Sequence, residues 1–201
     1  INLIKHMTQF EIRDGIAIIP EGTKEIEERA FENSDIRRVV IPDSVKKIGG
    51  RAFAQCKALE SVTFPNGLKT IPYSCFECCK SLQEVVIPES VTSIEQHAFL
   101  MCTALTDIKL PVNLLSISSK AFDMCHSLQS IVIPKGTRAI ADDAFVNCPS
   151  LRSIEVDANN PAFDSRGGSN SIIITSANRL ICGCSTTIIP DSVTEIWHHA
   201  F

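Results

Sequence analysis

The chain has 201 residues and a formal net charge of −4, so it carries no polybasic surface of the kind that binds nucleic acid. Its composition, 44% hydrophobic and 21% charged, excludes a disordered chain and is sufficient for one domain with a substantial core. The longest apolar runs, such as IAII and SIII, are far too short to cross a bilayer, so we expect no membrane insertion.

The N-terminal residues carry the signal of a β-hairpin. The chain begins at Ile1 rather than at Met, and we expect it to be processed or trimmed. In the stretch FEIRDGIAIIP, apolar residues alternate on both sides of Asp14-Gly15, a dipeptide that favours a type I′ turn. We predict that residues 1–19 form a hairpin cap over the exposed edge of the first coil.

A repeat of 22 or 23 residues fills residues 20–156 and returns in a partial copy at the end of the chain. Each copy opens with a proline, has an isoleucine six residues later and a phenylalanine eleven residues later. The prolines are Pro20, Pro42, Pro65, Pro88, Pro111, Pro134 and Pro190. The phenylalanines are Phe31, Phe53, Phe76, Phe99, Phe122, Phe145 and Phe201. Three columns held in register through seven copies indicate a repeat architecture.

Each copy predicts one or two short strands. LESVTFP (Leu59 to Pro65) alternates as a half-buried strand that ends at a proline without an N–H, and a second extended piece surrounds Leu68 to Ile71. The residues from there to Cys79 predict a turn or a single helical turn. One copy cannot bury its own apolar face, so we predict seven or eight stacked coils joined by parallel strands.

The repeat is interrupted after Val156. Residues 157–171 are rich in Asn, Gly and Ser and predict a loop, and residues 172–181 predict a hairpin. We expect residues 157–185 to form one enlarged repeat and residues 186–201 a partial last repeat, within a single solenoid over residues 1–201. Because the sequence stops in the middle of a copy, we expect further repeats in the parent protein.

Five of the nine cysteines lie three residues after a phenylalanine of the repeat. They are Cys56, Cys79, Cys102, Cys125 and Cys148. One thiol per coil forms a line rather than a tetrahedral site, which favours buried free thiols over disulfides or a bound metal. Of the others, Cys75 is expected in the core and Cys78 partly exposed, while Cys182 and Cys184 form a lone C-x-C pair that is weak evidence for a metal.

The histidines do not indicate catalysis. His97 and His199 share a column that otherwise holds polar residues, which predicts solvated surface positions. The repeat places no histidine beside a cysteine or serine nucleophile, and no Gly-rich phosphate loop is present. We therefore predict a protein that is not an enzyme and needs no cofactor or metal.

The residues that vary between copies are the candidates for function. Outward positions of the predicted strands form columns that mix charged and apolar side chains, a composition that suits an interface. An ordinary solvated strand face is an equally weighted alternative. The candidate binding face consists of Arg38, Val40, Glu60, Thr63, Glu84, Val86, Asp107, Lys109, Val132, Arg152 and Glu155.

The unit IPxSVxxIxxxAFxxCxxLxxIxIP resembles the BspA-type leucine-rich repeat family, with agreement in the proline, isoleucine, Ala-Phe and cysteine columns over residues 16–156 and 186–201. This resemblance implies an α/β, β-rich, right-handed leucine-rich-repeat solenoid with short helical turns. It also implies adhesion, or other binding of a protein or glycan, by a monomer at the cell surface or in secreted form. The alternatives are a structural spacer with weak end-to-end self-association, and a cytoplasmic location suited to many free cysteines.

Overall fold

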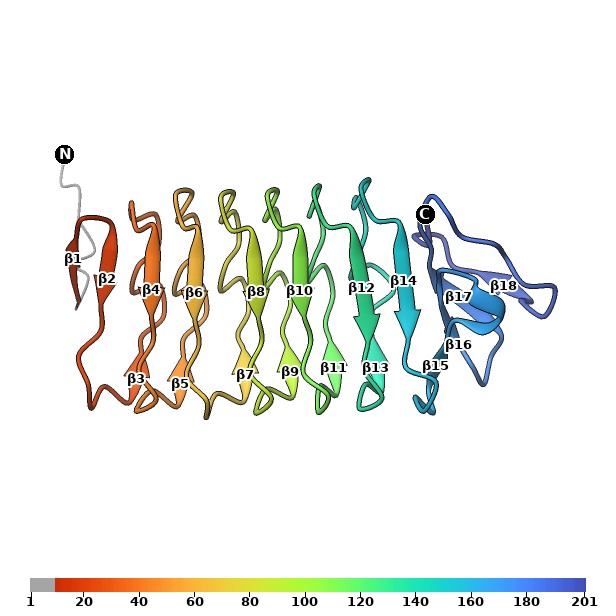
Figure 1. The fold of residues 1–201 in the computed structure, drawn as a ribbon, viewed down its shortest axis with the longest axis horizontal. Coiled ribbons are helices and arrows are strands. Elements are labelled where there is room, and N and C mark those ends of the chain that lie inside the picture. The colour runs from red at the N-terminus through yellow and green to blue at the C-terminus, as the bar shows by residue number, and fades with distance from the viewer. Residues whose placement is uncertain (1–9) are drawn as a thin grey trace.

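The repeat folds as a β-solenoid in the computed structural model, which describes residues 10–201 (Figure 1). Each regular coil has a longer strand on one side, here called the front face, and a two-residue strand on another side. The front strands are β4 (Arg38–Val40), β6 (Ser61–Thr63), β8 (Glu84–Val86), β10 (Asp107–Lys109), β12 (Ser130–Ile133) and β14 (Ser153–Val156). The second row consists of β3 (Glu25–Ile26), β5 (Lys47–Ile48), β7 (Thr70–Ile71), β9 (Ser93–Ile94), β11 (Ser116–Ile117) and β13 (Ala139–Ile140).

Paired strands of neighbouring coils are parallel, as predicted, and their register follows the repeat length. Arg38 pairs with Ser61, 23 residues later, and Ile26 pairs with Ile48, 22 residues later. In β4, β8 and β10 the middle residue is buried, as Val39 is, while its two neighbours are exposed. The front row contains six strands, so the prediction of seven or eight regular coils is wrong.

The predicted α/β class and short helical turns are also wrong. Within residues 10–201 the only helix is a 3₁₀ helix, η1 (Arg166–Gly168), which lies outside the regular coils. The turn segment of each regular coil contains one or two residues with a positive φ, and this left-handed conformation interrupts any right-handed helix. One position has a φ between 55° and 61° in all six coils. The residues at this position are Asn33, Gln55, Cys78, Met101, Met124 and Asn147.

The backbone groups of the turns are paired in two alternating directions. The amide of Phe53 donates to the carbonyl of Cys75 in the next coil at 3.0 Å, and the amide of Gln55 donates to the carbonyl of Glu77. Between them, the amide of Ala54 donates back to Arg51 in its own coil at 3.0 Å. Since every second N–H reaches the next coil, the turns hold the coils together as the strands do.

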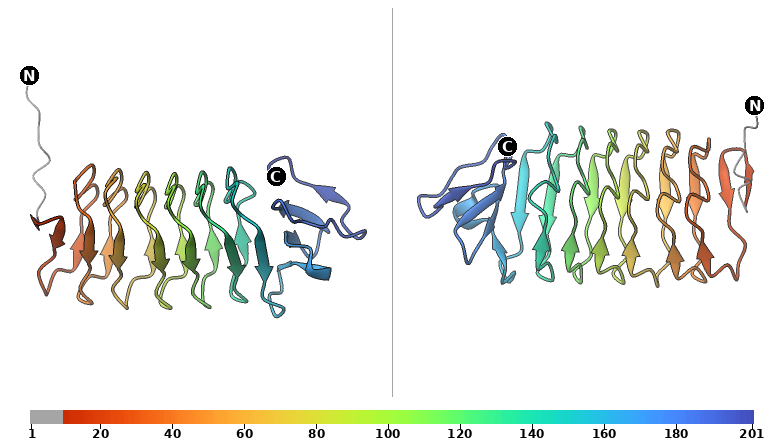
Figure 2. Two further views of the ribbon diagram at one scale, coloured as in Figure 1. Left: turned by 45° about the horizontal axis from the view of Figure 1, so that its top comes forward. Right: turned by 180° about the vertical axis from the view of Figure 1, so that it is seen from behind.

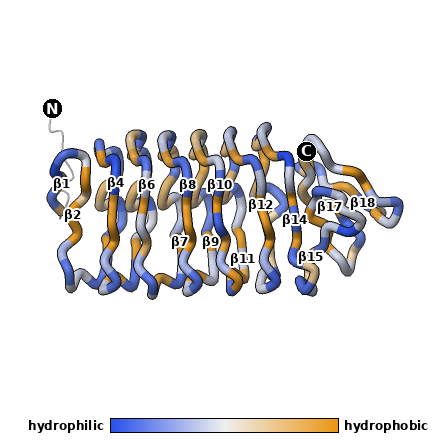
Figure 3. Tube along the Cα trace, viewed as in Figure 1, coloured by the Kyte–Doolittle hydropathy of each residue, from blue (hydrophilic) through white to orange (hydrophobic). Residues whose placement is uncertain are grey.

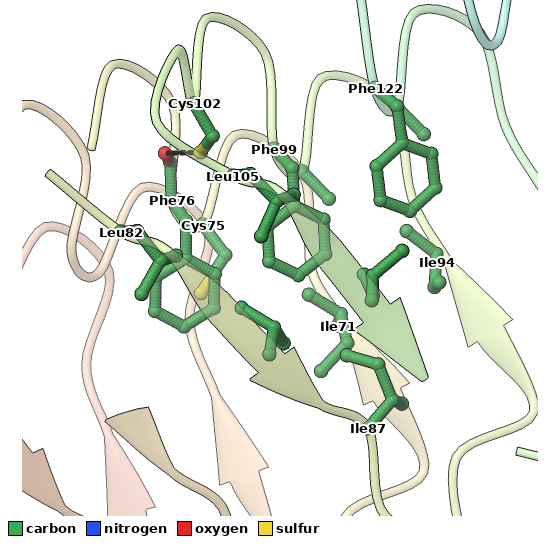
Figure 4. Packing of buried hydrophobic residues seen from close by; sticks show 14 of the residues in the cluster. Ile71, Cys75, Phe76, Leu82, Ile87, Ile94, Phe99, Cys102, Leu105 and Phe122 are labelled. Atoms are coloured by element: carbon green, nitrogen blue, oxygen red, sulfur yellow. Dashed lines mark hydrogen bonds between the residues drawn. The ribbon is translucent and has the colours of Figure 1, made fainter. Parts of the chain in front are cut away.

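A row of stacked phenylalanine rings forms the centre of the core (Figure 4). Consecutive rings from Phe10 to Phe145 lie 5.2–5.4 Å apart between centroids, with interplanar angles of 2–15°. The isoleucines and leucines of the repeat surround them, and Ile71, Leu82 and Ile94 are fully buried. In the regular coils, the phenylalanine, isoleucine and leucine columns therefore form buried rows along the solenoid.

An antiparallel hairpin precedes the first regular coil. Strands β1 (Glu11–Arg13) and β2 (Ile16–Ile18) meet at Asp14 and Gly15, whose φ angles are 51° and 76°, as in a type I′ turn. Strand β2 pairs in parallel with β4, which makes β1 the outer edge of the front row. The remainder of the predicted cap, residues 1–9, lies outside the described residues.

The C-terminal segment forms a separate four-stranded sheet at the end of the row. It contains β15 (Phe163–Asp164), β16 (Ile172–Ile174), β17 (Arg179–Cys182) and β18 (Glu195–Ile196). Figure 2 shows this sheet turned away from the line of regular strands. Ile172 and Ile181 join the core of the coils, whereas Ile173 and Leu180 pack with Ala200 in a small second cluster.

Candidate binding face

The eleven residues of the candidate binding face lie on the front strands or directly before them, and all are exposed. The strands thus bring residues of six repeat copies onto one surface. They are Arg38, Val40, Glu60, Thr63, Glu84, Val86, Asp107, Lys109, Val132, Arg152 and Glu155. Their participation in binding stays a prediction.

One column of this face alternates between valine and polar residues. Val40 pairs with Thr63, Val86 with Lys109, and Val132 with Glu155. The three valines are 54%, 65% and 54% exposed, in coils that alternate with the polar ones. Hydrophilic and hydrophobic residues are therefore mixed along the front strands (Figure 3), and an apolar group recurs at every second coil.

The charges of the face are only partly compensated. Arg37 and Glu60, on neighbouring coils, form an ion pair at 2.6 Å. Glu84 lies directly opposite Asp107 in the β8–β10 ladder, and within residues 10–201 neither carboxylate is in an ion pair. Like charges at opposed positions repel each other, so this part of the face favours a cationic group nearby.

The front ladder is open at two places, between β6 and β8 and between β10 and β12. At the first of these, no hydrogen bond in the described chain joins the two strands, although β4 pairs with β6 and β8 pairs with β10. Phe64 occupies the position of Ile41 and Ile87 in the adjacent coils, and its ring packs edge-on against Phe76 at 5.6 Å. This larger side chain distinguishes the β6–β8 junction from the β10–β12 junction, where Leu110 holds the same position.

A recess of about 580 Å³ lies on the face at this opening. It combines an apolar lining with carboxylates, hydroxyls and amides. Its lining residues are Glu60, Ser61, Val62, Thr63, Phe64, Asn66, Gln83, Glu84, Val86 and Pro88. Four of the eleven predicted residues therefore converge on one hollow, while the other seven are distributed along the strands outside it.

The same two coils are also unpaired in the second row, between β5 and β7. Two side chains span the junction there. Arg51 binds Glu32 of the preceding coil at 2.7 Å and Glu77 of the following coil at 2.6 Å. The ring of Tyr73 lies over Gly50, and its hydroxyl donates to Glu28 two coils away at 2.7 Å. This hydrogen bond raises the pKa of Tyr73.

The five column cysteines are buried or nearly buried thiols, as favoured from the sequence. Each S–H donates to the phenylalanine carbonyl of the preceding coil, from Cys56 to Phe31 at 3.0 Å through to Cys148 and Phe122 at 3.2 Å; Figure 4 shows the bond from Cys102 to Phe76. Burial raises the pKa of Cys56 to about 11 and that of Cys148 to about 12. These thiols are structural hydrogen-bond donors.

The remaining cysteines and the histidines of residues 10–201 differ in burial. Cys75 and Cys182 are buried, and Cys78 is half-buried in its left-handed turn with its sulfur 3.8 Å from that of Met101. Within residues 10–201, no three His, Cys, Asp or Glu side chains are arranged to hold a metal ion. His97 is half-buried at a φ of 60°, so it is less solvated than predicted.

Sequence reasoning did not find the open junction between β6 and β8. Its signal was Phe64 in a column otherwise held by isoleucine or leucine, directly before Pro65. The contact of Tyr73 with Glu28 across Gly50 could not be predicted from the sequence, because Tyr73 and Glu28 are 45 residues apart.

These features define a class: a β-solenoid of the leucine-rich repeat type with an exposed strand face. Residues 24–152 match the family described as BspA type leucine-rich repeat region, in 6 copies. The chain belongs to this family, which confirms the resemblance seen in the sequence. Comparison with curated proteins finds no match.

Solved structures of bacterial leucine-rich repeat proteins share the fold. A leucine-rich cell surface protein from Faecalibacterium prausnitzii A2-165 is 25% identical with a TM-score of 0.69, over 96% of this chain and 65% of that one. A leucine-rich repeat protein from Eubacterium ventriosum ATCC 27560 is 28% identical with a TM-score of 0.58, over 63% of this chain and 34% of that one. One from Bacteroides ovatus ATCC 8483, at 22% identity and a TM-score of 0.63 over 89% and 49%, is similar in fold alone.

The chain spans less than two thirds of the length of each of these three proteins. None of the helices in residues 10–201 has the length and hydrophobicity that a membrane crossing requires.

Proposed function

We propose that this protein is a non-catalytic interaction module that binds a protein or glycan along its front face, at the cell surface or in secreted form. The observation that carries the proposal is the row of exposed valines Val40, Val86 and Val132 among charged residues on one rigid face. Mixed apolar and charged surfaces on rigid scaffolds are typical of protein interfaces. The description of one structural relative as a cell surface protein supports the location.

The test is a binding screen of the purified chain against immobilised extracellular-matrix proteins and a glycan array, followed by front-face variants. For a ligand found in this way, Glu84→Lys combined with Lys109→Glu is expected to weaken binding at least about tenfold, because it reverses two exposed interface charges. The melting temperature is expected to stay the same, since both side chains are exposed.

Glu21→Lys is the matched control, because Glu21 is exposed outside the front face. An unchanged dissociation constant in the double front-face variant would exclude this face as the binding site. A spacer function by self-association would instead appear in light scattering, as a mass that grows with concentration and does not respond to the front-face variant.

A further inference from the structure

We propose that the recess between β6 and β8 binds a lysine or arginine side chain of a partner protein segment that lies extended along the solenoid axis. This inference rests on the proposed binding function of the front face and adds the chemistry of the partner.

The recess has the composition that a long basic side chain requires. Phe64, Val62 and Pro88 provide apolar surface, and Val86, the most exposed of the three front-face valines, forms part of its lining. Lysine and arginine pack their methylene stems against such apolar surface while the charged group remains near water and carboxylates. The carboxylate of Glu84 lines the same recess and supplies that partner.

The charge balance of the recess favours a cation from outside the chain. Glu60 is already paired with Arg37 at 2.6 Å, whereas Glu84 has no ion pair in the described part of the chain and faces Asp107 in the ladder. A partner cation in the recess beside Glu84 would offset this repulsion. An acidic or neutral occupant would leave it in place.

The valine row indicates the conformation of the partner segment. Val40 and Val132 are each two coils away from Val86. Two steps of paired strands span about 9.6 Å, and each of these distances is at least that long because it includes one unpaired junction, β6–β8 or β10–β12. A polyproline II helix has three residues per turn and advances about 9.3 Å in that turn. A segment with the pattern apolar-x-x-basic-x-x-apolar therefore places its apolar residues at Val40 and Val132 and its basic residue at the recess.

A glycan fits this surface less well. Sugar rings pack on exposed aromatic faces, and among the described front-face residues the only aromatic side chain is Phe64, which is 8% exposed. Tyr73, which is 42% exposed, lies on the other side of the junction, over Gly50.

The test uses the synthetic peptide acetyl-Leu-Pro-Pro-Arg-Pro-Pro-Leu-amide and the purified chain, with binding followed by isothermal calorimetry and by NMR shifts of front-strand amides. We expect saturable binding that weakens about threefold in Glu84→Gln, as for a single exposed ion pair, and that weakens in 0.5 M salt. Ser61→Tyr, which fills the recess, is expected to abolish binding. Gln96→Tyr and Glu21→Gln, at exposed positions outside the face, are expected to leave it unchanged.

Two peptide controls test charge and spacing separately. Replacing the arginine by glutamate is expected to abolish binding, and moving it one position, as in Leu-Pro-Arg-Pro-Pro-Pro-Leu, is expected to weaken it. The inference would be overturned if the parent peptide does not bind. It would also be overturned if Glu84→Gln and Ser61→Tyr bind the peptide as tightly as the unmutated chain does. If a ligand from the binding screen still requires Lys109 for its binding in that case, the front-face function stands and only the recess inference fails. The two failures are therefore distinguishable.

Discussion

At the scale of single residues, sulfur is used in this core as a compact hydrogen-bond donor. The carbonyl of Phe76 accepts the amide of Cys79 in its own coil at 3.1 Å and the thiol of Cys102 in the next coil, also at 3.1 Å. Both lone pairs of a buried carbonyl are thus satisfied. In the first coil, Ser34 occupies the cysteine column and donates to Phe31 at 2.7 Å, which shows that the position requires a small donor.

These thiols predict a loss of stability at alkaline pH. The pKa of Cys56 rises from 9.0 to about 11 in the folded chain. Above pH 9 the thiol therefore ionises in the unfolded state and stabilises it, while the thiol of the folded state stays neutral. The free energy of unfolding is expected to fall by about 1.4 kcal/mol per pH unit for this thiol between pH 9 and pH 11. Urea unfolding measured over this range checks the slope, and Cys56→Ser is expected to reduce it. An equal slope in the two proteins would contradict the assignment.

The spacing of the columns predicted the buried residues of the regular coils, whereas Ile196 and Phe201 of the last copy are exposed. Phenylalanine, isoleucine and cysteine recur once per coil, and stacked coils place equivalent positions on top of one another. The same spacing could not reveal the role of Cys78. Its position is defined by a left-handed backbone, which Asn33 and Asn147 in the same column are compatible with but which cysteine and methionine do not indicate.

At the scale of elements, the junction between the coils of β6 and β8 differs from the others. Its strands are unpaired in both rows, and the turns, Arg51 and Tyr73 connect the coils instead. The strands and their register followed from the repeat length. The opening did not, because the same repeat length is found at paired and at unpaired junctions.

Two adjacent glycines at this junction predict unequal effects of the same substitution. A Cβ at Gly49 would lie 2.4 Å from the backbone nitrogen of Glu28, whereas at Gly50 it would lie 2.0 Å from the ring of Tyr73. The backbone cannot move aside as an exposed ring can. We expect Gly49→Ala to cost about 2 kcal/mol and Gly50→Ala about 1 kcal/mol in unfolding free energy.

Tyr73→Ala provides the control for this pair in a double-mutant cycle. In that background Gly50→Ala is expected to cost almost nothing, since the clashing ring is absent, and Gly49→Ala is expected to keep its full cost. Equal costs for Gly50→Ala with and without Tyr73 would show that the ring does not occupy this space.

At the scale of the whole molecule, the stability of a solenoid is a sum of coils and of contacts between neighbouring coils. The hairpin of β1 and β2 covers one end of the phenylalanine row with Phe10, and the sheet of β15 to β18 follows the other end. We propose that residues 157–185 are best described as one enlarged coil, because Phe163, Ile172 and Ile181 belong to the same core cluster as the regular coils.

A charge in the middle of the row is expected to unfold the protein. Ile94 is fully buried in β9, which pairs with a strand on each side. Ile94→Asp places an unpaired carboxylate there, with an expected cost of at least about 3 kcal/mol. Cys102→Ser, in the same coil, keeps a donor and is expected to cost about 1 kcal/mol. Circular dichroism during urea unfolding measures both, and an unchanged midpoint for Ile94→Asp would refute the core assignment.

The row of buried thiols also implies that the rate of coil opening controls how fast the thiols of this protein are oxidised. A thiolate is the species that oxidants attack, and each column thiol is held neutral by burial and aimed at a carbonyl. An oxidant therefore reaches it only after the coil opens. The buried thiols then stay reduced in an oxidising environment for as long as the coils stay closed. The modification rate of each thiol therefore measures how often its coil opens.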